Sequence, residues 1–228
     1  MLFCLPYSGA GGSAFRELER ALPSAIDVAA VRLPGREQRF AEPPGLDLDD
    51  IAAAIAARAD RPYAIFGHSL GARLGFEVIR LLRRRGGLLP LRLYVAAARP
   101  PDAVNPIASA VELDDTRLVE VLIERIDAPS ELRDNPEFRD LMLPLLRSDL
   151  GWLHRNAYQP GPPLEVPIVA LAGAADSVCG GAEMLGWRTH TSASFALHTV
   201  PGGHFFPQTQ AGRVAGLLSA DLLAGAPR

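Results

Sequence analysis

The pentapeptide Gly67-His68-Ser69-Leu70-Gly71 constrains the possible folds of this chain more than any other segment. It follows an apolar run, residues 63–66, and precedes residues 72–82, which have helical periodicity. A strand, a G-x-S-x-G turn and a helix form a nucleophile elbow, in which the serine has a strained backbone and the glycines avoid collisions. The pattern predicts that the Ser69 hydroxyl stands at one edge of a sheet, at the positive end of a helix. Because G-x-S-x-G alone occurs often by chance, the remaining chain has to supply the other catalytic groups.

Short apolar runs alternate with helical patterns on both sides of the elbow. Such alternation, with strands that are apolar almost throughout, is typical of a mostly parallel sheet with helices on both faces. The expected fold class is therefore α/β, specifically an α/β-hydrolase fold. The expected strands cover residues 2–5, 26–33, 63–66, 91–98, 166–171 and 195–200, and a last helix covers about 208–223.

The alternation breaks after Asp102, and residues 113–158 show helical periodicity without a convincing strand. We therefore expect a single domain over residues 1–228 with a helical lid inserted at about 107–160. A mobile lid would gate substrate access. A rigid helical cap without gating has the same sequence pattern and stays open as an alternative.

Two further candidate catalytic residues follow two late strands. Asp176 comes after the first and His204 after the second, which gives the chain order Ser, Asp, His of α/β-hydrolases. A serine hydroxyl needs a base within hydrogen-bond reach, and the acid fixes the tautomer of that base. We therefore expect Ser69, His204 and Asp176 to form a triad. Asp102 also follows a strand end and is a rival for the acid.

Backbone amides are expected to hold the oxyanion that forms during attack. The glycine-rich loop after the first strand, residues 7–13, supplies one amide near Ser8, and Leu70 supplies the other. A flexible surface turn is the plainer interpretation of the loop. No H-x-x-x-H or C-x-x-C spacing occurs, so we expect neither a metal nor a cofactor.

Composition narrows the class of partner. The 228 residues carry a net charge of −3, which gives no electrostatic case for nucleic acid or an anionic membrane. There is no signal-peptide pattern and no apolar run long enough to span a bilayer, so we expect a cytoplasmic protein. Cys4 lies in an apolar run and is expected to be a buried free thiol.

Five segments resemble the type II thioesterases of polyketide and nonribosomal peptide assembly lines, and the resemblance spans nearly the whole chain. The resemblance implies that Ser69, Asp176 and His204 form the family triad, and that Ser8 and Leu70 supply the oxyanion amides. The glycine-rich loop departs from the common form of the family, which leaves the first donor uncertain by one residue. The segments are Pro6-Tyr7-Ser8-Gly9, Leu33-Pro34-Gly35-Arg36-Glu37-Gln38-Arg39, Phe66-Gly67-His68-Ser69-Leu70-Gly71-Ala72, Leu143-Pro144-Leu145-Leu146-Arg147-Ser148-Asp149 and Gly202-Gly203-His204-Phe205-Phe206.

The same resemblance implies an activity and a partner. The family hydrolyses acyl groups stalled on the phosphopantetheine arm of acyl or peptidyl carrier proteins, and so clears misprimed intermediates. We expect a monomer that acts on such carriers. A generic esterase, an acyl-CoA thioesterase and a non-catalytic interaction module are the alternatives. Arg83-Arg84-Arg85 could dock an acidic carrier, although arginines at a helix end also match the helix dipole.

Overall fold

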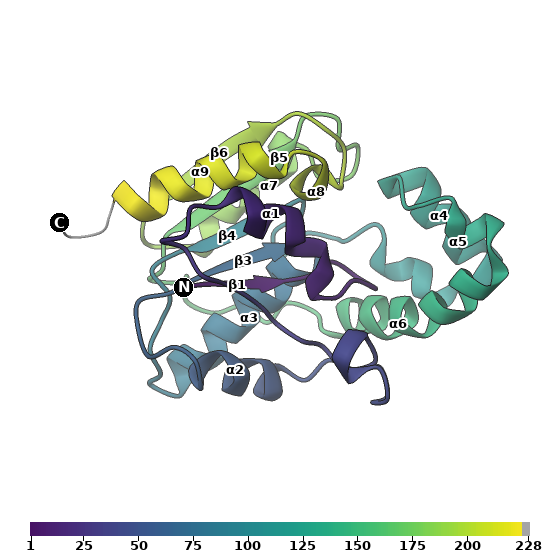
Figure 1. The fold of residues 1–228 in the computed structure, drawn as a ribbon, viewed down its shortest axis with the longest axis horizontal. Coiled ribbons are helices and arrows are strands. Elements are labelled where there is room, and N and C mark those ends of the chain that lie inside the picture. Colours follow the sequence, from purple (N-terminus) through teal and green to yellow (C-terminus); the bar gives the residue numbers. More distant parts are fainter. Residues whose placement is uncertain (225–228) are drawn as a thin grey trace.

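Six parallel strands form the central sheet in the computed structural model, which describes residues 1–224 (Figure 1). The strand order is β2-β1-β3-β4-β5-β6, and every neighbouring pair is parallel. The expected α/β fold class, a largely parallel sheet with helices, is confirmed. The strands are β1 (Leu2–Leu5), β2 (Val28–Ala30), β3 (Ala64–His68), β4 (Leu93–Ala96), β5 (Ile168–Gly173) and β6 (Phe195–Val200).

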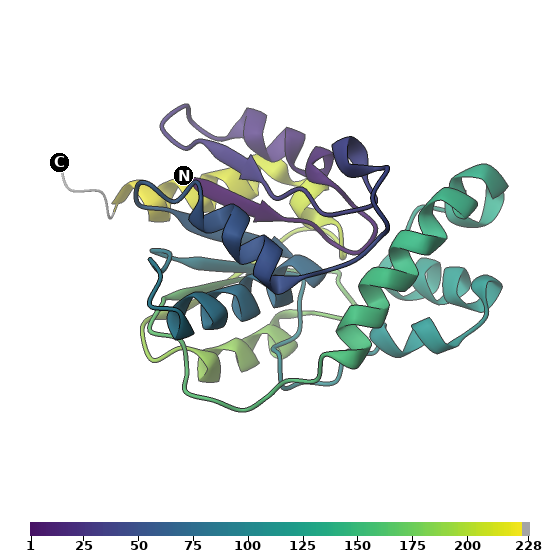
Figure 2. The same ribbon diagram turned by 90° about the horizontal axis from the view of Figure 1, so that it is seen from below.

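Helices cover both faces of this sheet (Figures 1 and 2). Helices α1 (Arg16–Ala21) and α9 (Ala211–Ala224) lie on one face, and α2 (Leu48–Ala56), α3 (Leu70–Arg84) and α7 (Gly181–Met184) lie on the other. Alternate residues of β1 serve the two layers, since Leu2 and Cys4 pack toward the first face and Phe3 and Leu5 toward the second. Both layers are therefore apolar, which explains the continuous apolar runs in the sequence.

The chain that connects β4 to β5 forms a group of helices, which lies beyond the carboxyl ends of the strands, at the right of Figure 1. It has an apolar cluster of its own, including Leu118, Leu122, Leu132 and Leu146, apart from the two layers on the sheet. All of these helices fall within the insertion expected from the sequence. They are the 3₁₀-helix η3 (Ala108–Glu112) and the α-helices α4 (Asp115–Ile126), α5 (Glu131–Asp134) and α6 (Pro136–Arg155).

The observed element boundaries differ from the expected ones in ways that have local causes. The strand expected over residues 166–171 starts only at Ile168, because Pro167 has no N–H to donate to the ladder. The strand expected over 26–33 shortens to β2, although the Val31 amide still bonds to the Cys4 carbonyl oxygen at 2.9 Å. A one-turn helix α8 (Phe206–Thr209) precedes α9, and η4 (Leu185–His190) follows α7. The 3₁₀-helices η1 (Gly12–Phe15) and η2 (Glu37–Arg39) complete the set in residues 1–224.

The two glycines of the elbow are required by close backbone contacts. A Cβ atom on Gly67 would lie 2.3 Å from the carbonyl oxygen of Gly71, and one on Gly71 would lie 2.0 Å from that of Leu5. Both obstacles are main-chain atoms, which cannot swing aside as a flexible side chain can. Helix α3 therefore packs against β1 at a distance that only glycine allows.

The contact at Gly71 yields a prediction about stability. Gly71→Ala forces α3 away from β1, so we expect a loss of more than about 3 kcal/mol in the free energy of unfolding, measured with urea. The control is Gly216→Ala in α9, where a Cβ meets nothing within 4 Å. That variant should gain about 0.5–1 kcal/mol, because alanine favours a helix interior. A Gly71→Ala protein as stable as wild type would contradict the packing described here.

Candidate active site

Ser69 occupies the sharp turn between β3 and α3. Its φ of 54° and ψ of −114° lie in a region that non-glycine residues rarely adopt, at a cost of about 1–3 kcal/mol. The Ser69 amide donates to the carbonyl oxygen of Ala96 on the neighbouring strand β4, at 2.8 Å. The strained serine is therefore held in place by the sheet, as the sequence pattern predicts.

His204 and Asp176 lie beside this serine and form a chain of hydrogen bonds with it. The Nε2 atom of His204 is 3.2 Å from the Ser69 hydroxyl oxygen, and its Nδ1 atom is 2.9 Å from Oδ2 of Asp176. Since a carboxylate only accepts, Nδ1 carries the proton and Nε2 is free to accept one. The side chains of His204 and Asp176 are 6% and 1% exposed. The structure thus brings together the three residues predicted from strand ends.

The Asp176 carboxylate has a full set of partners. Its Oδ1 atom accepts hydrogen bonds from the amides of Val178 and Cys179, each at 2.9 Å. Burial acts to raise the pKa of Asp176, but the hydrogen bond and charge of His204, together with the two amides, outweigh it and lower the pKa. Asp176 is therefore ionised near neutral pH.

His68 supports the site from behind, a role that the sequence did not reveal. Its ring is fully buried, and its Nε2 atom lies 2.9 Å from the carbonyl oxygen of His204. Burial, and then the charge of His204, lowers the pKa of His68 to about 3, so the ring stays neutral and donates to that carbonyl. The rings of Tyr7 and Phe205 pack edge-on against it. His68 therefore fixes the backbone of the residue that carries the base.

The two amides predicted for the oxyanion lie on the loop after β1 and at the start of α3. The loop turns at Ser8, where the Ala10 amide bonds to the Tyr7 carbonyl oxygen at 3.0 Å. Leu70 is the first residue of α3, so its amide has no acceptor within the helix. Within residues 1–224, neither the Ser8 nor the Leu70 amide donates a hydrogen bond to a protein group. Both remain available to an anion.

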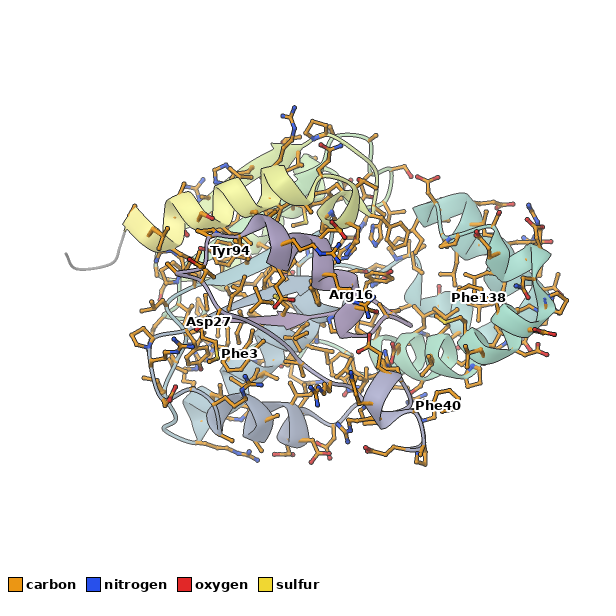
Figure 3. All side chains as sticks on the ribbon, in the orientation of Figure 1. Phe3, Arg16, Asp27, Phe40, Tyr94 and Phe138 are labelled. Carbon is orange, nitrogen blue, oxygen red and sulfur yellow. The ribbon has the colours of Figure 1, made fainter. Side chains whose placement is uncertain are left out.

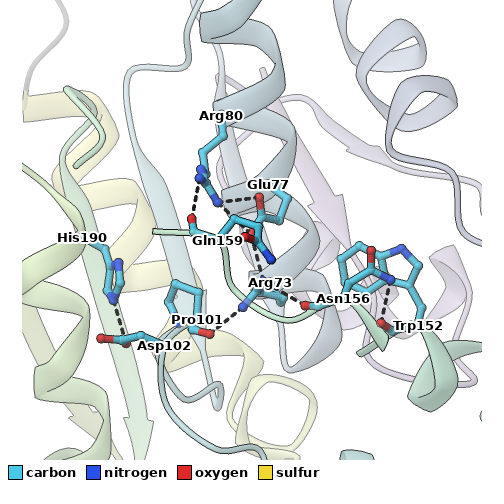
Figure 4. Close-up of polar contacts among 9 residues, drawn as sticks. All are labelled: Arg73, Glu77, Arg80, Pro101, Asp102, Trp152, Asn156, Gln159 and His190. Atoms are coloured by element: carbon cyan, nitrogen blue, oxygen red, sulfur yellow. Dashed lines mark hydrogen bonds and ion pairs between the residues drawn. The ribbon is translucent and has the colours of Figure 1, made fainter. Parts of the chain in front are cut away.

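Asp102, the rival acid, is engaged elsewhere (Figure 4). Its Oδ1 atom lies 2.8 Å from Nε2 of His190, and its side chain is 52% exposed. Beside it, Arg73 of α3 donates to the carbonyl oxygens of Pro101, at 2.7 Å, and Asn156, at 3.2 Å. The structure therefore places Asp102 in a group of contacts around the two ends of the helical segment, with His190 rather than His204 as its partner.

A cavity of about 910 Å³ opens at Ser69 and His204 and extends under the helices between β4 and β5. Helices α4 and α6 line it with apolar side chains, including Leu122, Phe138 and Met142, and Phe40 lines it from the loop after η2. Figure 3 labels Phe138 and Phe40 on these two parts of the chain. The size of the cavity lies within the range of small-molecule sites. Such a lining suits an apolar chain whose reactive end reaches Ser69.

The two cysteines are the other nucleophilic side chains considered in the described part of the chain, and neither has a base hydrogen-bonded to it as Ser69 has. Cys4 and Cys179 are buried free thiols, as expected for Cys4, and burial raises the pKa of both. Within residues 1–224, no group of three or more His, Cys, Asp or Glu side chains is arranged to hold a metal ion. No helix in the same range is long and apolar enough to cross a membrane.

The chain is similar to known thioesterases in both sequence and structure. The family model of the thioesterase domain matches residues 1–222. The chain is 36% identical to the thioesterase PikA5 of Streptomyces venezuelae, over 99% of this chain and 83% of that protein. Its structure resembles RedJ, a thioesterase from the prodiginine biosynthetic pathway in Streptomyces coelicolor, with 35% identity, a TM-score of 0.87 and coverage of 96% and 84%.

A third similar structure is a type II thioesterase, the type of enzyme that the sequence resembles. YbtT, a type II thioesterase from the yersiniabactin NRPS/PKS biosynthetic pathway, is 29% identical with a TM-score of 0.82, over 96% of this chain and 91% of that one. The resemblance noted in the sequence is thereby confirmed. The chain belongs to the thioesterase family and is a hydrolase of the α/β-hydrolase fold.

Proposed function

We propose that this thioesterase hydrolyses acyl groups from the phosphopantetheine arm of acyl or peptidyl carrier proteins. The observation that carries the proposal is the hydrogen-bonded chain from Ser69 through His204 to Asp176, at the mouth of an apolar cavity in a member of the thioesterase family. A single site of this kind can attack a carbonyl carbon and hold the acyl chain at the same time.

The proposed reaction has two halves. Ser69 Oγ attacks the thioester carbonyl carbon and its proton passes to Nε2 of His204, while the amides of Ser8 and Leu70 hold the oxyanion. The C–S bond then breaks, the thiol leaves with the proton from His204, and the acyl group stays on Ser69. Water attacks this ester with His204 again as base, which releases a carboxylic acid and restores Ser69. Asp176 stabilises the imidazolium in both halves.

The biosynthetic setting of the relatives supports a carrier-bound substrate. RedJ comes from the prodiginine biosynthetic pathway and YbtT from an NRPS/PKS pathway, and such pathways move acyl groups as thioesters. An enzyme that removes stalled or misprimed acyl groups there returns the free thiol to the carrier. The only reactants that the proposed steps need are the thioester, water and the side chains and amides named above.

We also propose that the helices within residues 107–160 form a lid on a single domain. Support comes from their own apolar cluster and from their share of the cavity lining. Arg73 bonds to Pro101, which precedes these helices, and to Asn156, which directly follows α6. Arg80 donates to the carbonyl oxygen of Gln159 at 2.7 Å. Any lid motion would therefore take place between ends that are anchored to α3.

The assignment of the acid yields a prediction. Asp176→Asn presents an N–H to Nδ1 of His204 and favours the wrong tautomer, so kcat should fall by about 10³–10⁴-fold. Asp102→Asn leaves the pair of His204 and Asp176 intact and should change kcat by less than about tenfold. Both rates are measured on one acyl thioester, with thermal unfolding as the check on folding. A larger loss for Asp102→Asn would reverse the assignment.

The proposed substrate class is tested by presenting one acyl group in three forms. The carriers of that group are a phosphopantetheinylated carrier protein, coenzyme A and a simple alkyl ester, with Ser69→Ala as the inactive control. We expect kcat/KM on the carrier protein to exceed both others by at least about tenfold, because the carrier adds contacts outside the cavity. Equal or higher values on the simple ester would favour a generic esterase, and on coenzyme A an acyl-CoA thioesterase.

A further inference from the structure

Two sequence motifs that have no part in the triad meet at one buried ion pair. Arg36 belongs to the segment Leu33–Arg39 and Asp149 ends the segment Leu143–Asp149, 113 residues further along the chain. Nη1 of Arg36 lies 2.8 Å from Oδ2 of Asp149, and Nη2 lies 2.9 Å from Oδ1. The side chains are 4% and 0% exposed. The geometry is the two-pronged contact that guanidinium and carboxylate groups favour.

This ion pair also holds the loop that follows β1. Oδ2 of Asp149 accepts a hydrogen bond from the Gly9 amide at 2.8 Å, and Nη1 of Arg36 donates to the Ala10 carbonyl oxygen at 3.0 Å. Gly9 has a φ of +82°, so this peptide orientation depends on glycine as well. The first and the third peptide groups after Ser8, Ser8–Gly9 and Ala10–Gly11, are therefore fixed by buried charged groups.

The residue next to Arg36 fixes the other end of the same loop. The carboxylate of Glu37 accepts hydrogen bonds from the amides of Gly12, at 3.0 Å, and Ser13, at 2.8 Å. Burial acts to raise the pKa of Glu37, but the bonds from Ser13 and Gly12 and the charge of Arg16 outweigh it and lower the pKa. Glu37 makes these contacts with a φ of 49°, a strained backbone for a residue other than glycine.

General energetics argue that the ion pair serves a purpose other than stability. Removing two charges from water is unfavourable, and apolar residues of similar volume often stabilise a protein equally well. A carboxylate with a guanidinium and an amide as partners has, however, a single low-energy orientation. What the pair supplies beyond apolar packing is a fixed position for the loop around Ser8.

We propose that Arg36 and Asp149 are positioning residues that hold the Ser8 amide where the oxyanion forms. Because Asp149 lies on α6, the pair also makes the oxyanion site dependent on the position of the helical segment that covers the cavity. This inference rests on the proposed function, in which Ser8 and Leu70 bind the oxyanion.

The test replaces the ion pair by apolar residues in the double variant Arg36→Met with Asp149→Leu. We expect lower thermal stability than wild type, because the buried Gly9 amide and Ala10 carbonyl oxygen lose their partners. The folded variant should have an unchanged KM and a kcat lower by about a hundredfold, the effect of losing one oxyanion donor. Glu42→Gln is the matched control, since it removes the exposed ion pair of Arg39 on the same loop and leaves the Ser8 loop alone. It should retain wild-type kcat.

A second readout separates positioning from a general effect on the cavity. An alkyl trifluoromethyl ketone forms a hemiketal in which its carbonyl carbon bonds to Ser69 Oγ, the C=O π electrons move to its oxygen to give the oxyanion, and the Ser69 proton passes to Nε2 of His204. The matched methyl ketone fills the cavity without stable addition. In the double variant, affinity for the trifluoromethyl ketone should fall by about the same factor as kcat, with affinity for the methyl ketone unchanged. Equal losses for both ketones, or wild-type kcat and affinities, would overturn the proposal.

Two further variants keep the outcome decisive. If the double variant does not fold, Arg36→Lys keeps the charge but not the two-pronged contact, and should lower kcat by about tenfold at constant KM. An unchanged kcat in that variant counts against positioning. Ser69→Ala tests the underlying function by itself. Undiminished affinity of Ser69→Ala for the trifluoromethyl ketone would refute Ser69 as nucleophile, whereas lost affinity there with no effect at Arg36 and Asp149 would refute only the positioning role.

Discussion

The contact between Gly71 and the carbonyl oxygen of Leu5 is the constraint on which the candidate site depends. Because Gly71 has no side chain, α3 packs directly against the backbone of β1, and Ser69 lies in a strained turn at the carboxyl edge of the sheet. Because β1 ends at Leu5, the same contact brings the loop around Ser8 beside the start of α3. The serine and the two amides available to an anion are therefore arranged by one backbone packing event, and His204 and Asp176 reach them from the ends of β6 and β5.

The sequence predicted the parts of this arrangement that depend on short patterns. Ser69, Asp176 and His204 follow strand ends, and in a parallel sheet the carboxyl ends of the strands share one edge, so their proximity could be inferred without coordinates. The alternation of strands and helices likewise indicated the fold class. Strand boundaries were less accurate, because pairing to a neighbouring strand and the missing N–H of Pro167 decide where a strand begins.

The supporting contacts could not be predicted from local patterns, because they join residues far apart in the chain. His68 donates to the backbone of His204, 136 residues away, and Arg36 pairs with Asp149, 113 residues away. No local pattern indicated a partner for Arg36, and Asp102 was a rival for the acid of the triad. In the structure Arg36 braces the loop of Ser8, and Asp102 bonds to His190. Arg83 and Arg85, considered for docking, contact the carbonyl oxygens of Pro162 and Pro163 and the carboxylate of Asp49.

The most direct test of this account is the mass of the protein during the first turnover. The thioesterase is mixed with an acyl thioester, quenched in acid within milliseconds and digested with a protease. The mass of the peptide that contains Ser69 is then measured by mass spectrometry. The account predicts an increase equal to the acyl group minus one hydrogen on this peptide, and none in Ser69→Ala. Two results would contradict the account. One is an acyl group found on another residue, such as Cys179, during normal turnover, and the other is turnover that persists in Ser69→Ala.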